Sequence, residues 1–192
     1  MKNIAVINGS LRKDSLNRTL AEAIAGLAAE SMRFQFVEIG DLPLYNEDLW
    51  AQPPESVLRL KREVEAADAV LFVTPEYNRS FSPAIKNAID WGTRPWGQNS
   101  WESKPSAVIG TSPGAGGAMA GQNALKSLLT VVDTVQMGQP EVYFQFKPEL
   151  FAADGSVADE KTREFLMRWV RRFDGFIERV SPPKTSAQAD AA

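Results

Sequence analysis

The chain has 192 residues, of which 44% are hydrophobic and 23% are charged, and its formal net charge is −3. This length and composition favour one soluble domain with a substantial core, and the mild negative charge argues against a general nucleic-acid binder. The chain contains neither cysteine nor histidine, which excludes disulfides, thiolate nucleophiles, Cys/His metal sites and a Ser-His-Asp triad.

The first part of the chain alternates apolar runs with helical stripes. A near-continuous apolar run at 3–9 predicts a buried strand, and residues 15–30 place apolar side chains on one face of a helix. The run at 34–40 partly alternates, which suits an edge strand. Residues 54–66 repeat the helical pattern.

The rest of the chain continues this alternation. DAVLFVTP (68–75) is the strongest predicted strand, followed by a short helix at 83–91 and a strand at 105–112. A helix at 117–131, a weaker strand at 134–138 and a long helix at 159–180 complete the set. Residues 181–192 lack apolar content and predict a disordered tail.

Strands that alternate with helices predict an α/β fold with right-handed crossovers. We expect a doubly wound, five-stranded parallel sheet of order 2-1-3-4-5, with helices on both faces, built from residues 1–180. No apolar stretch approaches the roughly 20 residues that a membrane span requires. The first residues, MKNIAVINGS, carry no cleavage-site pattern, so we expect a cytoplasmic protein without a membrane partner.

In such a sheet, ligands lie beyond the carboxyl ends of the strands, near the point where the strand order reverses. Three predicted loops meet at that edge. They are the first loop, NGSLRKDSLN (8–17), the second loop, TPEYNRSFSP (74–83), and the third loop, TSPGAGG (111–117). All three contain more polar, glycine or proline residues than a minimal connection requires, so we expect them to share one ligand site.

The first loop fits a bound phosphate. The N-terminus of the following helix offers unpaired N–H groups to an anion, and Ser10, Ser15 and Asn17 add neutral donors. Arg12 can contribute a charge-assisted hydrogen bond. The single Gly9 matches neither a P-loop nor a GxGxxG fingerprint, so the loop favours a terminal phosphate monoester.

A simpler interpretation of the first loop is structural. Asp14 or Ser15 can cap the helix while the basic side chains are solvated. Lys13 and Arg18 fit this interpretation best, and we expect both to be surface charges rather than ligands of the phosphate.

The second and third loops suit a flat heterocycle. Thr74 and Ser82 each precede a proline, which favours an extended turn that presents the backbone groups of residues 76–78. Tyr77 can stack or donate a hydrogen bond, whereas Glu76 can equally be a solvent-exposed loop acid. We expect Ser82 to cap the next helix. The glycines of the third loop allow a ligand to approach the backbone closely.

Three segments together resemble the NADPH-dependent FMN reductase family of flavodoxin-like quinone, azo-dye and chromate reductases. They are GSLRKDSLNR (9–18), PEYNRSFSPAIKNAIDW (75–91) and SPGAGG (112–117). The resemblance implies that the first loop binds the FMN phosphate and that the other two lie along the isoalloxazine ring. The cofactor-binding residues that it implies are Ser10, Arg12, Ser15, Leu16, Asn17, Pro75, Glu76, Tyr77, Asn78, Ser112 and Gly114.

The resemblance also implies an activity. We expect an FMN-dependent NAD(P)H oxidoreductase that reduces quinones or similar small acceptors, such as azo compounds, nitroaromatics or chromate, by ping-pong hydride transfer. The flavin would carry the redox step, which suits a chain without histidine or cysteine, and no residue is assigned as a catalytic acid or base. NADPH or NADH would be the electron donor.

Two alternatives use the same fold: a flavodoxin-like electron carrier and a non-enzymatic, FMN-binding regulatory protein. The resemblance implies a homodimer or homotetramer, and the mild negative charge leads us to expect no nucleic-acid partner. Met119 stands where many relatives carry a basic residue after the third loop, which weakens the transfer of the family's tetramer contacts to this chain.

Overall fold

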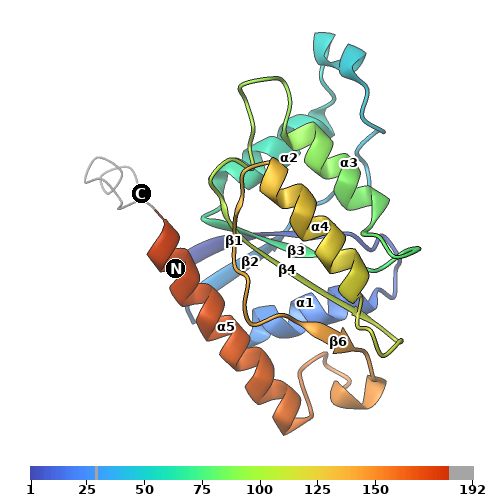
Figure 1. Cartoon of the computed structure of the whole chain (residues 1–192), viewed down its shortest axis with the longest axis vertical. Helices are drawn as coiled ribbons and strands as arrows, with labels where there is room; N and C mark the ends of the chain where they lie inside the picture. Colours follow the sequence, from blue (N-terminus) through green and yellow to red (C-terminus); the bar gives the residue numbers. More distant parts are fainter. Residues whose placement is uncertain (29, 182–192) are drawn as a thin grey trace.

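The structure is a computed structural model that describes residues 1–28 and 30–181 (Figure 1). Its parallel sheet consists, in spatial order, of β2 (Met32–Phe36), β1 (Lys2–Asn8), β3 (Ala69–Val73), β4 (Pro105–Ser112) and β5 (Val135–Gln136). This order confirms the predicted 2-1-3-4-5 arrangement. The tail predicted at 181–192 lies outside the described residues, apart from Ser181.

The fifth position of the sheet differs from the prediction. β5 pairs only with Pro105 and Ser106 at the start of β4, and a further strand, β6 (Tyr143–Gln145), pairs in parallel with Gly110–Ser112 near its end. Two short segments therefore occupy the position expected for one strand at 134–138. Pro140 lies between them and has no N–H to donate to a strand ladder, which favours the interruption.

The helices cover both faces of the sheet, as predicted (Figure 1). On one face lie α1 (Leu16–Leu27) and α5 (Glu160–Val180); on the other lie α2 (Glu55–Ala66), α3 (Pro83–Gly92) and α4 (Met119–Val131). Two short 3-10 helices, η1 (Glu47–Ala51) and η2 (Pro148–Leu150), occupy connections. Among the described residues, no helix combines the length and the apolar character that a membrane crossing requires.

The apolar side chains form two cores, one on each face of the sheet. Every residue of β3 is buried, as expected for a central parallel strand that is covered on both sides. Trp169 and Phe173 of α5 pack in the core shared with α1, whereas Trp91 of α3 and Trp101 pack in the other. These layers hold the carboxyl ends of β1, β3 and β4, and the loops that follow them, at one edge.

Candidate functional site

A cavity of about 170 Å³ lies where the three loops meet. We call it the three-loop cavity. Most of the residues predicted for the site line it, namely Ser10, Arg12, Ser15, Leu16, Asn17, Pro75, Glu76, Tyr77 and Ser112. Thr111 and Pro113, which the sequence did not single out, complete the lining. The structure therefore brings together residues that are up to about a hundred positions apart in the chain.

The two remaining predicted residues, Asn78 and Gly114, do not line this cavity. Gly114 lines an adjoining cavity of about 160 Å³, which also contacts Glu76, Ser112 and Met119. Asn78 lines neither cavity; it is exposed and follows Tyr77 in a turn, with a φ of 51°.

Ser15 shows that the structural interpretation of the first loop was correct for one residue. It is 4% exposed and is the N-cap of α1, because its Oγ accepts a hydrogen bond from Arg18 N at 3.1 Å. A hydroxyl that accepts a hydrogen bond retains its own O–H for a further acceptor. The cap and a contact with an anion are therefore compatible.

Asn17 ties the first loop to the third. Its side-chain Nδ2 donates to the carbonyl oxygen of Thr111 at 3.1 Å, and its Oδ1 accepts from the Thr111 backbone N–H at 3.0 Å. Asn17 is 4% exposed, so this pair of hydrogen bonds is shielded from water. Its amide therefore holds the end of β4 against the start of α1.

Ser82 ties the second loop to the first. Its Oγ donates to the carbonyl oxygen of Gly9 at 2.6 Å and accepts from Ala84 N at 3.1 Å. The second of these bonds is the predicted N-cap of α3, which is thereby confirmed. The first bond was not predicted, and it gives the capping residue a second role.

Glu76 ties the second loop to the helix that follows the third. Its Oε2 accepts hydrogen bonds from the backbone N–H groups of Ala120, at 3.0 Å, and Gly121, at 3.2 Å. The N-cap residue of α4, Ala118, has no side chain that could satisfy them. The carboxylate thus caps α4 from another loop, where its charge also complements the helix dipole. The Glu76 side chain is 17% exposed, so it is not a solvated loop acid.

Glycines allow these close approaches. A Cβ on Gly121 would lie 2.9 Å from Ser80 O, so only glycine lets α4 begin so near the second loop. A Cβ on Gly117, which has a φ of 53°, would lie 2.4 Å from the carbonyl carbon of Tyr143. The third loop was expected to use its glycines for a ligand, but at Gly117 the close neighbour is the backbone of β6.

The available donors of the cavity are concentrated on the first loop. Arg12 is exposed and makes no ion pair among the described residues, so its guanidinium is available to an anion. The α1 N-terminus lies beside it. On the other side, Pro75 is buried, whereas Tyr77 is 49% exposed. The arrangement provides an anion site at one end and an open aromatic wall at the other.

Comparisons with known proteins agree with this geometry. Residues 2–149 match a family described as NADPH-dependent FMN reductase. A quinone reductase from Pseudomonas putida is 48% identical over 177 residues, which cover 92% of this chain and 95% of the relative. A 2-hydroxy-1,4-benzoquinone reductase from a Burkholderia species is 44% identical over 174 residues, which cover 91% of this chain and 95% of the relative.

A solved structure shows the same similarity in three dimensions. FerB from Paracoccus denitrificans, described as a flavoenzyme NAD(P)H:(acceptor) oxidoreductase, superposes with a TM-score of 0.92 and is 57% identical. The match covers 94% of this chain and 99% of that one.

Proposed function

Because the chain belongs to the NADPH-dependent FMN reductase family, we propose that its three-loop cavity is the site where FMN binds and where quinones are reduced. The protein is an FMN-dependent NAD(P)H oxidoreductase with a flavodoxin-like fold, and its acceptors are quinones or similar small molecules. The observation that carries the proposal for the site is that residues of all three motifs line one cavity at the predicted edge of the sheet.

The lining residues fit FMN. The phosphate would contact Ser10, the Arg12 guanidinium and the backbone N–H groups of Leu16 and Asn17, because these donors have no hydrogen-bond partner among the described residues, whereas Arg18 N is bonded to Ser15. Backbone groups of Pro75, Glu76 and Tyr77 would lie along the ring, and Ser112 and Gly114 near its edge.

For two predicted ligands, the contacts indicate a positioning role. The Asn17 amide is engaged with Thr111, and the Glu76 carboxylate is engaged with α4. We therefore propose that these two side chains hold the loops in place, and that Glu76 contacts the flavin through its backbone.

Bound FMN would supply the hydride chemistry, and the protein would bind, orient and shield the reactants. Backbone N–H groups of the second loop would favour negative charge at the nearby edge of the ring, since fixed dipoles need no reorganisation when charge develops. Tyr77 is half-exposed, so the outer side of the cavity is open to a donor and then to an acceptor. No side chain of the cavity is assigned as a proton donor.

We also propose a homodimer or homotetramer that works in the cytoplasm, where NAD(P)H is available. Support for self-association comes from large apolar side chains that lie exposed to solvent: Leu44 is 84%, Trp96 83% and Val131 81% exposed.

The test is an absorbance spectrum of the purified protein, before and after anaerobic addition of NADPH. We expect a flavin band that NADPH bleaches and that a small quinone restores, with steady turnover when both are present. An electron carrier would keep the flavin band but oxidise NADPH with quinone only very slowly. A colourless protein that added FMN does not restore would contradict the proposal.

A further inference from the structure

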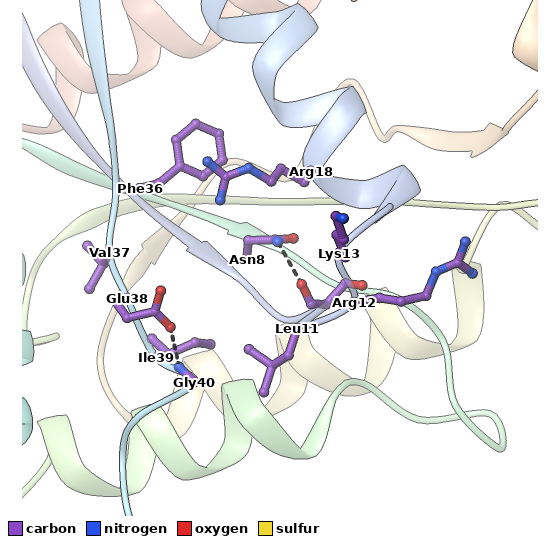
Figure 2. A pocket seen from close by; sticks show the side chains of 11 residues that line it. Asn8, Leu11, Arg12, Lys13, Arg18, Phe36, Val37, Glu38, Ile39 and Gly40 are labelled. Atoms are coloured by element: carbon purple, nitrogen blue, oxygen red, sulfur yellow. Dashed lines mark hydrogen bonds between the residues drawn. The ribbon is translucent and has the colours of Figure 1, made fainter.

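A second and larger cavity, of about 690 Å³, lies on the other side of the first loop. We call it the basic pocket. Figure 2 shows its two walls: Leu11 and Lys13 of the first loop lie across from residues 36–40, which are the last residue of β2 and the four that follow it, whereas the Arg12 side chain extends away from them. Arg18 of α1 lies over Phe36. The proposed flavin site uses only the rim of this pocket, at Ser10 and Arg12.

Positive charge dominates the lining. The lining includes three cations, Arg12, Lys13 and Arg18, and a single acidic residue, Glu38, although the chain as a whole has a net charge of −3. Lys13, like Arg12, makes no ion pair among the described residues, whereas Arg18 pairs with Glu22 at 2.8 Å. The Arg18 guanidinium carbon lies 4.6 Å from the centre of the Phe36 ring, which helps to hold it over the pocket.

Lys13 and Arg18 are exposed, as expected of surface charges, but they are not isolated on the surface. The two side chains line one cavity together, because β2 pairs with β1 and brings the segment 36–40 opposite the first loop. The sequence around the two cations does not reveal this facing wall.

We propose that the basic pocket binds the adenosine half of the NAD(P)H donor and that its cations favour the 2′-phosphate of NADPH. The inference rests on the proposed function of the neighbouring cavity. In Rossmann folds, whose glycine fingerprint this chain lacks, an acidic residue after the second strand binds the ribose hydroxyls of NAD, and an arginine nearby accommodates the 2′-phosphate of NADP. Glu38 follows β2 by two residues, and the cations lie across from it.

Two unused acceptors support a polar ligand with hydroxyl or amino groups. Glu38 Oε1 accepts from Gly40 N at 2.7 Å, which holds the carboxylate in place, and its Oε2 has no partner in the part of the chain that the structure describes. Asn8 Nδ2 donates to Ser10 O at 3.0 Å, whereas its buried Oδ1 lacks a donor among the described residues. A donor on a bound ligand would satisfy either oxygen.

The position of the pocket suits a donor that reaches the flavin. Because Ser10 and Arg12 line both cavities, the two spaces adjoin at the first loop. A dinucleotide that places its adenosine among Lys13, Arg18 and Glu38 would cross this rim with its pyrophosphate. Its nicotinamide would then lie on the side of the three-loop cavity.

The test is calorimetric titration of the FMN-loaded protein with 2′,5′-ADP and with 5′-ADP. We expect 2′,5′-ADP to bind more tightly, because it adds a phosphate to the same adenosine. Lys13→Glu should weaken 2′,5′-ADP binding by about tenfold or more, with a smaller loss for 5′-ADP. Glu38→Gln should strengthen 2′,5′-ADP binding several-fold, because the amide keeps an oxygen that can accept from the ribose and removes a negative charge near the 2′-phosphate. Opposite shifts at two facing residues cannot arise from misfolding.

Arg33→Glu provides the matched control, since Arg33 is an exposed cation on β2 that does not line the basic pocket. Its 2′,5′-ADP affinity should stay within about twofold of the parent value. The inference is overturned if 2′,5′-ADP does not bind, or if neither Lys13→Glu nor Glu38→Gln changes its affinity while FMN remains bound. Loss of FMN from the unaltered protein would instead contradict the proposed function.

Discussion

The two cavities that flank the first loop use polar residues in different ways. Around the three-loop cavity, Asn17, Ser82 and Glu76 each satisfy backbone groups of another loop or helix, and the first two are almost fully buried. In the basic pocket, Lys13 is exposed and makes no ion pair among the described residues, as is also true of Arg12 on the rim that the two cavities share. Fixed hydrogen bonds define a precise shape, whereas exposed charges attract a ligand without dictating its position.

This difference predicts that substitutions in the two sets of residues affect ligand affinity and the free energy of unfolding differently. Substitutions that remove the hydrogen bonds between loops should lower both the free energy of unfolding and the affinity for FMN. Substitutions of the exposed cations should alter ligand affinity alone.

Asn17→Ala should have the largest effect. It leaves the buried N–H and C=O of Thr111 without their partner, so we expect the free energy of unfolding to fall by about 2–4 kcal/mol. The end of β4 would also move relative to α1, and FMN should bind at least tenfold more weakly. Urea unfolding and fluorescence titration with FMN measure the two quantities.

Asn87→Ala is the matched control for that variant. The Asn87 amide likewise bonds backbone groups, accepting from Tyr45 N and donating to Pro43 O, but it lies outside the three loops. Asn87→Ala should lower the free energy of unfolding by a similar amount and leave FMN affinity unchanged. Equal losses of FMN affinity in both variants would show that the hydrogen bonds between Asn17 and Thr111 have no special role at the site.

Arg12→Ala should weaken FMN binding by about 1.5–3 kcal/mol, the value of a charge-assisted hydrogen bond. The free energy of unfolding of the apoprotein should hardly change, because the Arg12 side chain is exposed and unpaired among the described residues. An unaltered FMN dissociation constant would remove Arg12 from the phosphate site, and Arg33→Ala controls for the general loss of charge.

Glu76→Ala should reduce the free energy of unfolding by about 1–2 kcal/mol, because α4 loses its cap. Hydrogen exchange at the amides of Ala120 and Gly121 should accelerate, and FMN affinity should fall several-fold. Glu76→Gln keeps an acceptor and should lie between the parent and the alanine variant. Unchanged exchange at these two amides in Glu76→Ala would contradict the capping role.

A higher salt concentration should produce the smallest effect, and it should weaken ligand binding in the basic pocket more than in the three-loop cavity. Raising the ionic strength from about 0.05 M to about 0.5 M screens exposed charges much more than buried contacts. The KM for NADPH should therefore rise several-fold, with little change in kcat. The affinity for 5′-ADP should weaken less than that for 2′,5′-ADP, and equal salt dependence of the two would argue against recognition of the 2′-phosphate.

The sequence predicted the elements of the fold well because their signals are local. The continuous apolar run at 105–112 coincides with β4, and each helical stripe corresponds to an observed helix. The second strand was placed too late, at 34–40 instead of Met32–Phe36, because the apolar residues continue past the last paired residue. The split of the fifth strand into β5 and β6 depends on pairing with β4, which periodicity does not report.

The site was predictable as a set of residues but not as a set of contacts. The three motifs identified the lining, and the capping role of Ser82 followed from the adjacent Pro83. The bonds from Asn17 to Thr111 and from Glu76 to Ala120 span 94 and 44 positions, and no local pattern in the sequence indicates them. Likewise, no local pattern indicates that residues 36–40 lie opposite Lys13 in the basic pocket.

The most direct test of the central claim is a crystal structure of the protein with FMN and 2′,5′-ADP bound. We predict the FMN phosphate against Ser10, Arg12 and the start of α1, with the ring along residues 75–78, and the 2′-phosphate near Lys13 on the far side of the first loop. An FMN phosphate in the basic pocket, or an empty three-loop cavity, would contradict the claim.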